Sequence, residues 1–148
     1  MKYLFLNFCF LLSNAVLAQN DTVGKVIFYE SHEELKKNAP FSDIVKAGDL
    51  YFLSGQIGMD HSTRTLVNGG IVSETKQALE NIKAVLNYHG LSLKNVVKCT
   101  VVLSDIEDFA AFNTIYTSYF PHKPARTTFA AKGLARGAKI EIDCIAAK

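Results

Sequence analysis

Two side chains capable of anion and acid–base chemistry lie near the end of the chain. In the segment PARTTFAAKGLARGAKIEIDC (124–144), Arg126 opens one apolar stretch and Glu141 lies inside a second one. Both stretches have the residue types of sheet strands, where an unpaired charge is costly. Either the two groups neutralise each other, or Arg126 offers its guanidinium to a ligand carboxylate and leaves Glu141 free to handle protons. If the two strands pair directly, both side chains lie near one end of the sheet.

The first eighteen residues have the composition of a secretory signal peptide. Lys2 gives a positive start, an apolar run follows, and the small residues Val16 and Ala18 precede a cleavage site after residue 18. The apolar run is shorter than the ~20 residues that cross a bilayer. We therefore expect residues 1–18 to be removed on export to the periplasm or the medium. Residues 19–148 then form one domain without a membrane contact.

The overall charge argues against nucleic acid as a partner. The chain has 16 Lys and Arg against 14 Asp and Glu, a formal net charge of +2. Loss of Lys2 with the export signal leaves 15 − 14 = +1. The basic residues are scattered along the sequence and form no cluster of the kind that binds a phosphate backbone.

Two cysteines follow the export signal, Cys99 and Cys144, and neither has metal-ligand spacing to another cysteine or to a histidine. Both lie in apolar strand patterns, where a buried free thiol is ordinary. In an oxidising compartment they would form a disulfide if their Cβ atoms lay within about 4 Å of each other. Both states stay open, and the cysteine spacing indicates no metal site.

The hydrophobic pattern predicts an α+β domain with the element order β-β-α-β-α-β-β. Strands are expected at 24–30, 49–56, 96–103 and in the two stretches that carry Arg126 and Glu141. Apolar residues recur at helical spacing over 73–89 and 104–120, and Ser104 or Asp105 can cap the second helix. Both helices are expected on one face of a mixed sheet. The other face would stay half protected in a single chain, which favours an oligomer.

Three blocks of the sequence resemble the Rid family of reactive intermediate/imine deaminases, also called the RidA/YjgF or L-PSP family. The C-terminal block is PARTTFAAKGLARGAKIEID. The other two are APFSDIVKAGDLYFLSGQIG and a middle block that runs from Glu74 to Phe120. The likeness covers residues 38–148, nearly the whole chain after the export signal.

The resemblance implies a chorismate-mutase-like fold and a homotrimer whose sheets form an inner barrel, with sites in clefts between subunits. It implies hydrolysis of 2-imino and 2-enamino acids to 2-oxo acids and ammonia, the 2-iminobutanoate/2-iminopropanoate deaminase type, without a cofactor. Carried over to this chain, it makes Arg126 the group that grips the substrate carboxylate. Glu141 becomes the group that holds or deprotonates the attacking water.

The same resemblance assigns five substrate-binding residues, namely Phe41, Ser54, Gly55, Asn113 and Thr128. Thr128 stands where the family often has a cysteine, so its backbone N–H is expected to serve. Phe41 replaces a frequent tyrosine and loses the hydroxyl. Simpler roles stay open for Asn113 as a solvated helix residue and for Gly55 as a turn glycine.

Two features depart from the family. The loop GLARG (133–137) has Ala135 and Arg136 where a Pro-Lys pair is common, which indicates a different preference for substrate size. The export signal separates the chain from imines made in the cytoplasm, which would hardly survive transit. The chain is therefore expected to act on longer-lived imines made by an amino-acid oxidase outside the cytoplasm. The alternative is an exported trimeric binding module for small carboxylates, without turnover.

Overall fold

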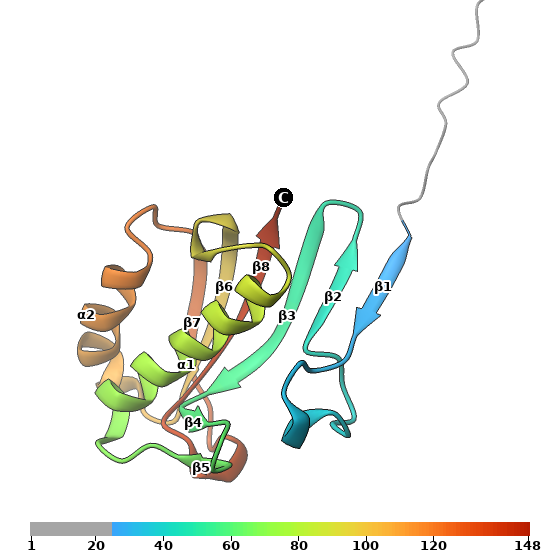
Figure 1. The fold of residues 1–148 in the computed structure, drawn as a ribbon. Helices are drawn as coiled ribbons and strands as arrows, with labels where there is room; N and C mark the ends of the chain where they lie inside the picture. The colour runs from blue at the N-terminus through green and yellow to red at the C-terminus, as the bar shows by residue number, and fades with distance from the viewer. Residues whose placement is uncertain (1–24) are drawn as a thin grey trace, which may run out of the picture.

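A six-stranded sheet with two helices on one face makes up most of the fold (Figure 1). The computed structural model describes residues 25–148, so the expected signal peptide, 1–18, lies outside the described residues. The sheet strands are β1 (Val26–Tyr29), β2 (Ile44–Ala47), β3 (Leu50–Ile57), β6 (Val96–Leu103), β7 (Ala125–Ala130) and β8 (Ile140–Ala147). The helices are α1 (Gly70–Tyr88) and α2 (Phe109–Tyr119). No helix in the described part of the chain is long and apolar enough to cross a bilayer.

The spatial order of the strands is β1-β2-β3-β8-β6-β7, and all neighbours are antiparallel except β6 and β7, which are parallel. The predicted α+β class, the mixed sheet and the placement of both helices on one face are confirmed (Figure 1). The predicted element order was incomplete. It lacks β2, whose four residues are too few for a clear alternation, and the small hairpin of β4 (Met59–Asp60) and β5 (Thr65–Leu66).

The last two strands of the chain are not neighbours in the sheet. β6 lies between them, paired with β7 on one side and with β8 on the other. After β6 the chain passes through α2 on the helix face of the sheet. It then returns as β7, parallel to β6, as a strand–helix–strand unit does. β8 then enters the centre of the sheet, antiparallel to both β3 and β6. A direct pairing of the strands that carry Arg126 and Glu141 is therefore wrong.

Alternating residues of the central strands pack against the helices and form the core. In β8, Ile140, Ile142 and Cys144 are fully or almost fully buried, and they share one cluster with Leu79 and Ile82 of α1. The intervening residues of β8 must point to the opposite face of the sheet, because side chains alternate along a strand. This alternation determines where the charged residues of β8 can reach.

The two helices begin differently from their expected starts. α1 begins at Gly70, after Gly69 with a φ of 112°, so the helix extends three residues before the expected Ser73. α2 begins at Phe109 and is preceded by a 3₁₀ turn, Ile106–Asp108. The Asp105 side chain accepts a hydrogen bond from the Glu107 N–H at 3.0 Å. Asp105 therefore caps the 3₁₀ turn and not α2 itself.

The two cysteines face each other across neighbouring strands. Cys99 of β6 is the register partner of Cys144 of β8, and the two buried Sγ atoms lie 3.2 Å apart as free thiols. The contact with Cys99 and burial raise the pKa of the Cys144 thiol, so Cys144 stays protonated at neutral pH. The free-thiol pair is one of the two states that the sequence leaves open.

The face of the sheet away from the helices carries an exposed apolar row. Phe28, Val45, Phe52 and Ile145 are successive register partners across β1, β2, β3 and β8. Phe28 is 70% exposed and Phe52 is 40% exposed. Apolar surface of this extent on one face of a sheet is usually covered by another surface. The expected oligomer would cover it.

We expect Phe52→Asp to break this assembly, because a carboxylate on the apolar row would have to be desolvated without a partner. Size-exclusion chromatography with light scattering should show the wild type as a multiple of the chain and the variant shifted toward the single chain. Val72→Asp on α1 is a matched control, since Val72 is 39% exposed on the helix side. Equal masses for wild type and Phe52→Asp would contradict the prediction.

Candidate functional site

Arg126 lies at the start of β7 and turns its guanidinium toward α2. Its register partner is Cys99 in the core, so its side chain is on the helix face of the sheet. Arg126 Nη1 donates a hydrogen bond to Asn113 Oδ1 at 2.8 Å. The Cζ atom lies 5.6, 5.1 and 4.6 Å from the ring centroids of Phe109, Phe112 and Tyr116. Three aromatic faces and one neutral amide therefore hold the cation.

No carboxylate neutralises Arg126 within the described residues. None of the ion pairs found there involves it. Burial raises the pKa of the Tyr116 phenol, so this neighbour is neutral as well. The guanidinium lines an open cavity of about 370 Å³ together with Asn113, Lys123 and Pro124. Because Asn113 engages one terminal nitrogen, other N–H groups of the planar fork stay available to an anion in this cavity.

Glu141 lies on the opposite face of the sheet, where its carboxylate rests against the main chain of Gly55. Its register partner on β3 is Ile57, just after a shift in the β3–β8 pairing between Leu53 and Gln56. A methyl group built on Gly55 would lie 2.9 Å from Glu141 Cδ and would overlap the carboxylate. Gly55 is thus required here for a close approach.

Two influences raise the pKa of Glu141. Burial is the larger, because the ionised carboxylate loses part of its hydration, and the negative charge of Asp143 adds to it. A carboxyl group with a raised pKa exchanges its proton closer to neutral pH than an ordinary glutamate does. Glu141 therefore has the property expected of a proton-transfer group.

Phe41, Ser54 and Gly55 gather around Glu141, and the four residues line a cavity of about 180 Å³. The Ser54 hydroxyl donates to the carbonyl oxygen of Ser42 at 2.6 Å, so its proton is engaged and only its lone pairs face other partners. Phe41 is 53% exposed and forms an open aromatic wall. Three of the five predicted substrate-binding residues thus lie beside Glu141.

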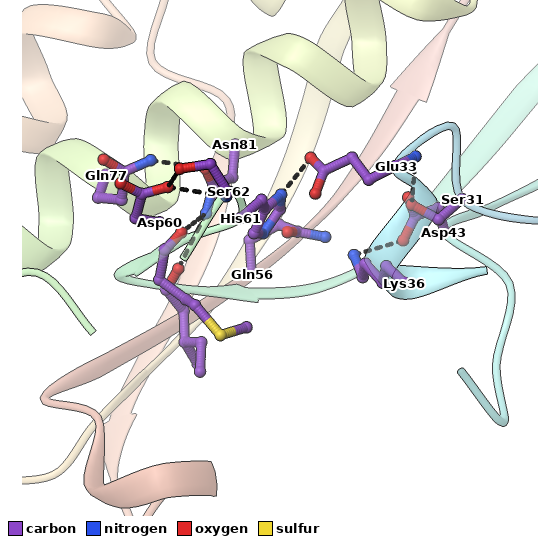
Figure 2. Close-up of polar contacts among 12 residues, drawn as sticks. Ser31, Glu33, Lys36, Asp43, Gln56, Asp60, His61, Ser62, Gln77 and Asn81 are labelled. Carbon is purple, nitrogen blue, oxygen red and sulfur yellow. Dashed lines mark hydrogen bonds and ion pairs between the residues drawn. The ribbon is translucent and has the colours of Figure 1, made fainter. Parts of the chain in front are cut away.

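A second, larger cavity of about 270 Å³ shares Phe41, Gly55 and Glu141 with the first. Beyond these residues it is lined by apolar side chains, by Gln56, and by the basic residues Lys36, His61, Arg64 and Arg136. Figure 2 shows two of the basic groups with their acidic partners: Lys36 points to Asp43, and His61 points to Glu33. Lys36 and Asp43 are both almost fully buried, so each needs the other to offset its lost hydration.

The structure gathers the predicted site residues into two separate groups. Arg126 and Asn113 lie together on the helix face, and Glu141 lies with Phe41, Ser54 and Gly55 on the other face. The cavity that holds Arg126 shares no lining residue with the two cavities beside Glu141. Within one chain, Arg126 and Glu141 can neither pair with each other nor hold the same ligand.

Thr128 is the one predicted residue that joins neither group. It follows Arg126 by two positions on the same face of β7, opposite Val101, and it lines neither set of cavities. Its Oγ1 is buried without a hydrogen-bond partner among the described residues. A role for its backbone N–H stays a prediction.

Several residues of the site were missed from the sequence. The aromatic faces around Arg126 come from Phe109, Phe112 and Tyr116, whose spacing places them on one side of α2 together with Asn113. In the sequence alone this spacing is the same as that of a helix face packed on a core, so it does not indicate a cation site. Arg64 was not singled out, because nothing in its turn sequence connects it with Glu141. Among the described residues, no group of three or more His, Cys, Asp or Glu is placed to hold a metal.

Comparison with known proteins identifies close relatives. A family model described as "Endoribonuclease L-PSP" matches residues 31–148. The chain is 44% identical over 108 residues to the 2-iminobutanoate/2-iminopropanoate deaminase of Mus musculus, which covers 72% of this chain and 80% of that one.

Solved structures show the same fold. A putative endoribonuclease from Thermotoga maritima superposes with a TM-score of 0.77 at 42% identity, covering 82% of this chain and 97% of that one. E. coli TdcF with bound serine has a TM-score of 0.70 at 31% identity, covering 74% of this chain and 88% of that one.

We expect Asn113→Asp to weaken the binding of small carboxylates by about tenfold or more, because it places a charged acceptor where the neutral amide now contacts Arg126. The change is nearly isosteric and gives Arg126 an acidic partner, which it does not have among the described residues. Titration calorimetry with 2-oxobutanoate measures the effect. Asn87→Asp, the same substitution on α1 outside both groups, is the control. An unchanged affinity in Asn113→Asp would show that Arg126 does not bind the ligand.

Proposed function

The chain belongs to the Rid (L-PSP) family, and on that premise we propose that it hydrolyses 2-imino and 2-enamino acids to 2-oxo acids and ammonia. Relatives named 2-iminobutanoate/2-iminopropanoate deaminase, at 44% identity, support this reaction. The observation that carries the proposal is the guanidinium of Arg126, which is held in a cavity without a carboxylate partner among the described residues.

We propose that the site is completed by a second copy of the chain, in a homotrimer. Arg126 and Glu141 lie on opposite faces of one sheet, so a site that uses both needs Arg126 from one subunit and Glu141 from the next. The exposed apolar row on the Glu141 side of the sheet gives such an assembly a surface to bury. Each trimer would then contain three equivalent sites.

Arg126 positions the substrate. Its free N–H groups donate hydrogen bonds to the carboxylate at C1, and this contact fixes C2, the imine carbon, relative to Glu141. The aromatic faces around the guanidinium stabilise the cation and keep its plane in one orientation.

Glu141 handles the protons of the hydrolysis. The oxygen of a water bonds to C2 of the protonated imine while Glu141 accepts one of the water's protons, and the C=N π electrons move to nitrogen, which becomes an amine. Glu141 then gives this proton to the nitrogen and takes the proton of the C2 hydroxyl as the C2–N bond breaks, so that C2 becomes a ketone, ammonia leaves, and Glu141 passes the last proton to the ammonia or to solvent. One water is consumed and one ammonia is released per imine. The pKa of Glu141, raised by burial and by Asp143, suits a group that both takes and returns a proton.

The decisive assay generates 2-iminopropanoate with an amino-acid oxidase and traps the remaining imine with semicarbazide. We expect the purified protein to reduce the trapped imine. Arg126→Ala and Glu141→Gln should each lower kcat/KM by about 100-fold, through loss of the bidentate contact and of the proton-transfer group respectively. Lys94→Ala, a charge loss outside the site, should act like the wild type. Wild-type protein that leaves the trapped imine unchanged would refute the proposal.

The pH dependence of kcat/KM should reflect the ionisation of the Glu141 carboxyl group. As a base it is active when ionised, so its raised pKa places the acid-side loss of kcat/KM at a higher pH than for an ordinary glutamate. Asp143→Asn removes the negative charge that adds to this shift, and the acid limb should move to lower pH. Asp49→Asn, an exposed residue, is the control. The substrate titrates identically in all variants. If the acid limb of the kcat/KM profile has the same position in Asp143→Asn as in the wild type, Glu141 is ruled out as the titrating base.

The alternative is a binding module for small carboxylates. The separation of Arg126 from Glu141 in one chain favours it, because the Arg126 cavity alone could hold a carboxylate. In that case the expected export would place a carboxylate-binding protein outside the cytoplasm. Calorimetry that shows unchanged 2-oxo acid binding by Glu141→Gln, with no turnover by the wild type, would favour this alternative.

We do not extend the family description as an endoribonuclease to this chain. Its formal net charge of +2 gives little attraction for a polyanion. RNA cleavage that stays constant through further purification would reverse this judgement.

A further inference from the structure

The larger cavity beside Glu141 has a charge that imine hydrolysis alone does not require. Lys36, His61, Arg64 and Arg136 line it, and Glu141 is the single carboxylate among its lining residues in the described chain. A substrate with an apolar side chain would contact the apolar part of the lining but would gain nothing from these four basic groups.

Two of these four basic groups have acidic partners and two do not. Lys36 pairs with Asp43 and His61 pairs with Glu33, as Figure 2 shows. Neither Arg64 nor Arg136 takes part in an ion pair within residues 25–148. The positive charge of the cavity that remains after pairing therefore comes from the two arginines.

Arg64 also has an unused hydrogen-bond donor. Its Nη1 is buried and has no acceptor among the described residues. The nearest acidic residue in the turn, Asp60, accepts instead from Ser62 N at 2.8 Å and from Ser62 Oγ at 2.7 Å. A buried donor on a charged group without an acceptor is costly, and an oxygen of a bound ligand would remove that cost.

The two arginines are held together across two loops. Arg136 Nη1 donates to the carbonyl oxygen of Arg64 at 3.3 Å. Both residues adopt left-handed backbone conformations, with φ of 59° for Arg64 and 60° for Arg136. Glycine would take this conformation at no steric cost, so a long side chain at both positions is retained against the local backbone preference.

We propose that this cavity binds a second carboxylate, carried at the end of the substrate's side chain, and that the chain therefore prefers dicarboxylic 2-imino acids. The inference rests on the proposed hydrolysis. The two cavities meet at Glu141 and share Phe41 and Gly55. With C1 on Arg126 and C2 beside Glu141, the side chain enters the larger cavity and its terminal carboxylate reaches Arg64 and Arg136. This carboxylate only binds, so the reaction itself is unchanged.

The test compares two imines of equal chain length. An amino-acid oxidase generates 2-iminoglutarate from glutamate and 2-iminopentanoate from norvaline, and semicarbazide traps what remains. We expect the ratio of kcat/KM for the dicarboxylic over the monocarboxylic imine to exceed one in the wild type. It should fall by about tenfold in Arg64→Gly and in Arg136→Gly, the usual effect of losing a hydrogen bond to a charged group.

Glycine suits both backbone conformations, and the two variants are made separately, so a folding failure of one leaves the other to decide. Lys132→Gly is the matched control, because Lys132 is an exposed cation in the same β7–β8 connection but does not line the cavity. A wild-type ratio at or below one, or a ratio that both arginine variants leave unchanged, overturns the inference while the hydrolase proposal stands.

A separate binding measurement applies if neither imine is hydrolysed and the hydrolase proposal fails. Calorimetry then compares 2-oxoglutarate with 2-oxopentanoate. Tighter binding of the dicarboxylate, lost in the arginine variants and weakened by salt, supports the second carboxylate site. Equal affinities for the two oxo acids overturn it.

Discussion

A positive charge that is half buried and has no counter-ion among residues 25–148 is the constraint on which the site depends. Burying an unpaired guanidinium is costly, and proteins usually place a carboxylate beside it. Here the Asn113 amide and three aromatic rings of α2 take that role. They stabilise the cation without cancelling its charge, so Arg126 keeps its attraction for an anion that arrives from outside.

The alternation of side chains along the strands adds a second constraint. Arg126 is in register with the buried Cys99, whereas Glu141 lies between the buried Ile140 and Ile142. The two functional groups are therefore out of phase and point to opposite faces of the same sheet. In the proposed assembly this arrangement becomes useful, because each face contributes half of a site. The same face that carries Glu141 also carries the apolar row that would drive association.

The sequence predicted the parts of this structure that local patterns determine. Apolar residues at helical spacing predicted both helices, and alternating apolar and polar residues predicted the long strands. The capping role of Asp105 follows from its side-chain chemistry. The insertion of β6 between β7 and β8 was not predictable in this way, because parallel pairing depends on the path of the whole chain through α2. The grouping of Arg64 and Arg136 escaped for the same reason, since they come from two loops 72 positions apart in the sequence.

Gly55 has a consequence for how this site can change. Its φ is not positive, so the backbone would accept alanine, and only the Glu141 carboxylate excludes it. The cost of a larger residue at position 55 thus depends on the length of the acid at position 141. Substitutions at the two positions should be strongly epistatic: a side chain at 55 that is harmful beside glutamate becomes tolerable once Glu141→Asp withdraws the carboxylate by one methylene. Relatives in which position 55 carries a larger residue are therefore expected to differ at position 141 as well.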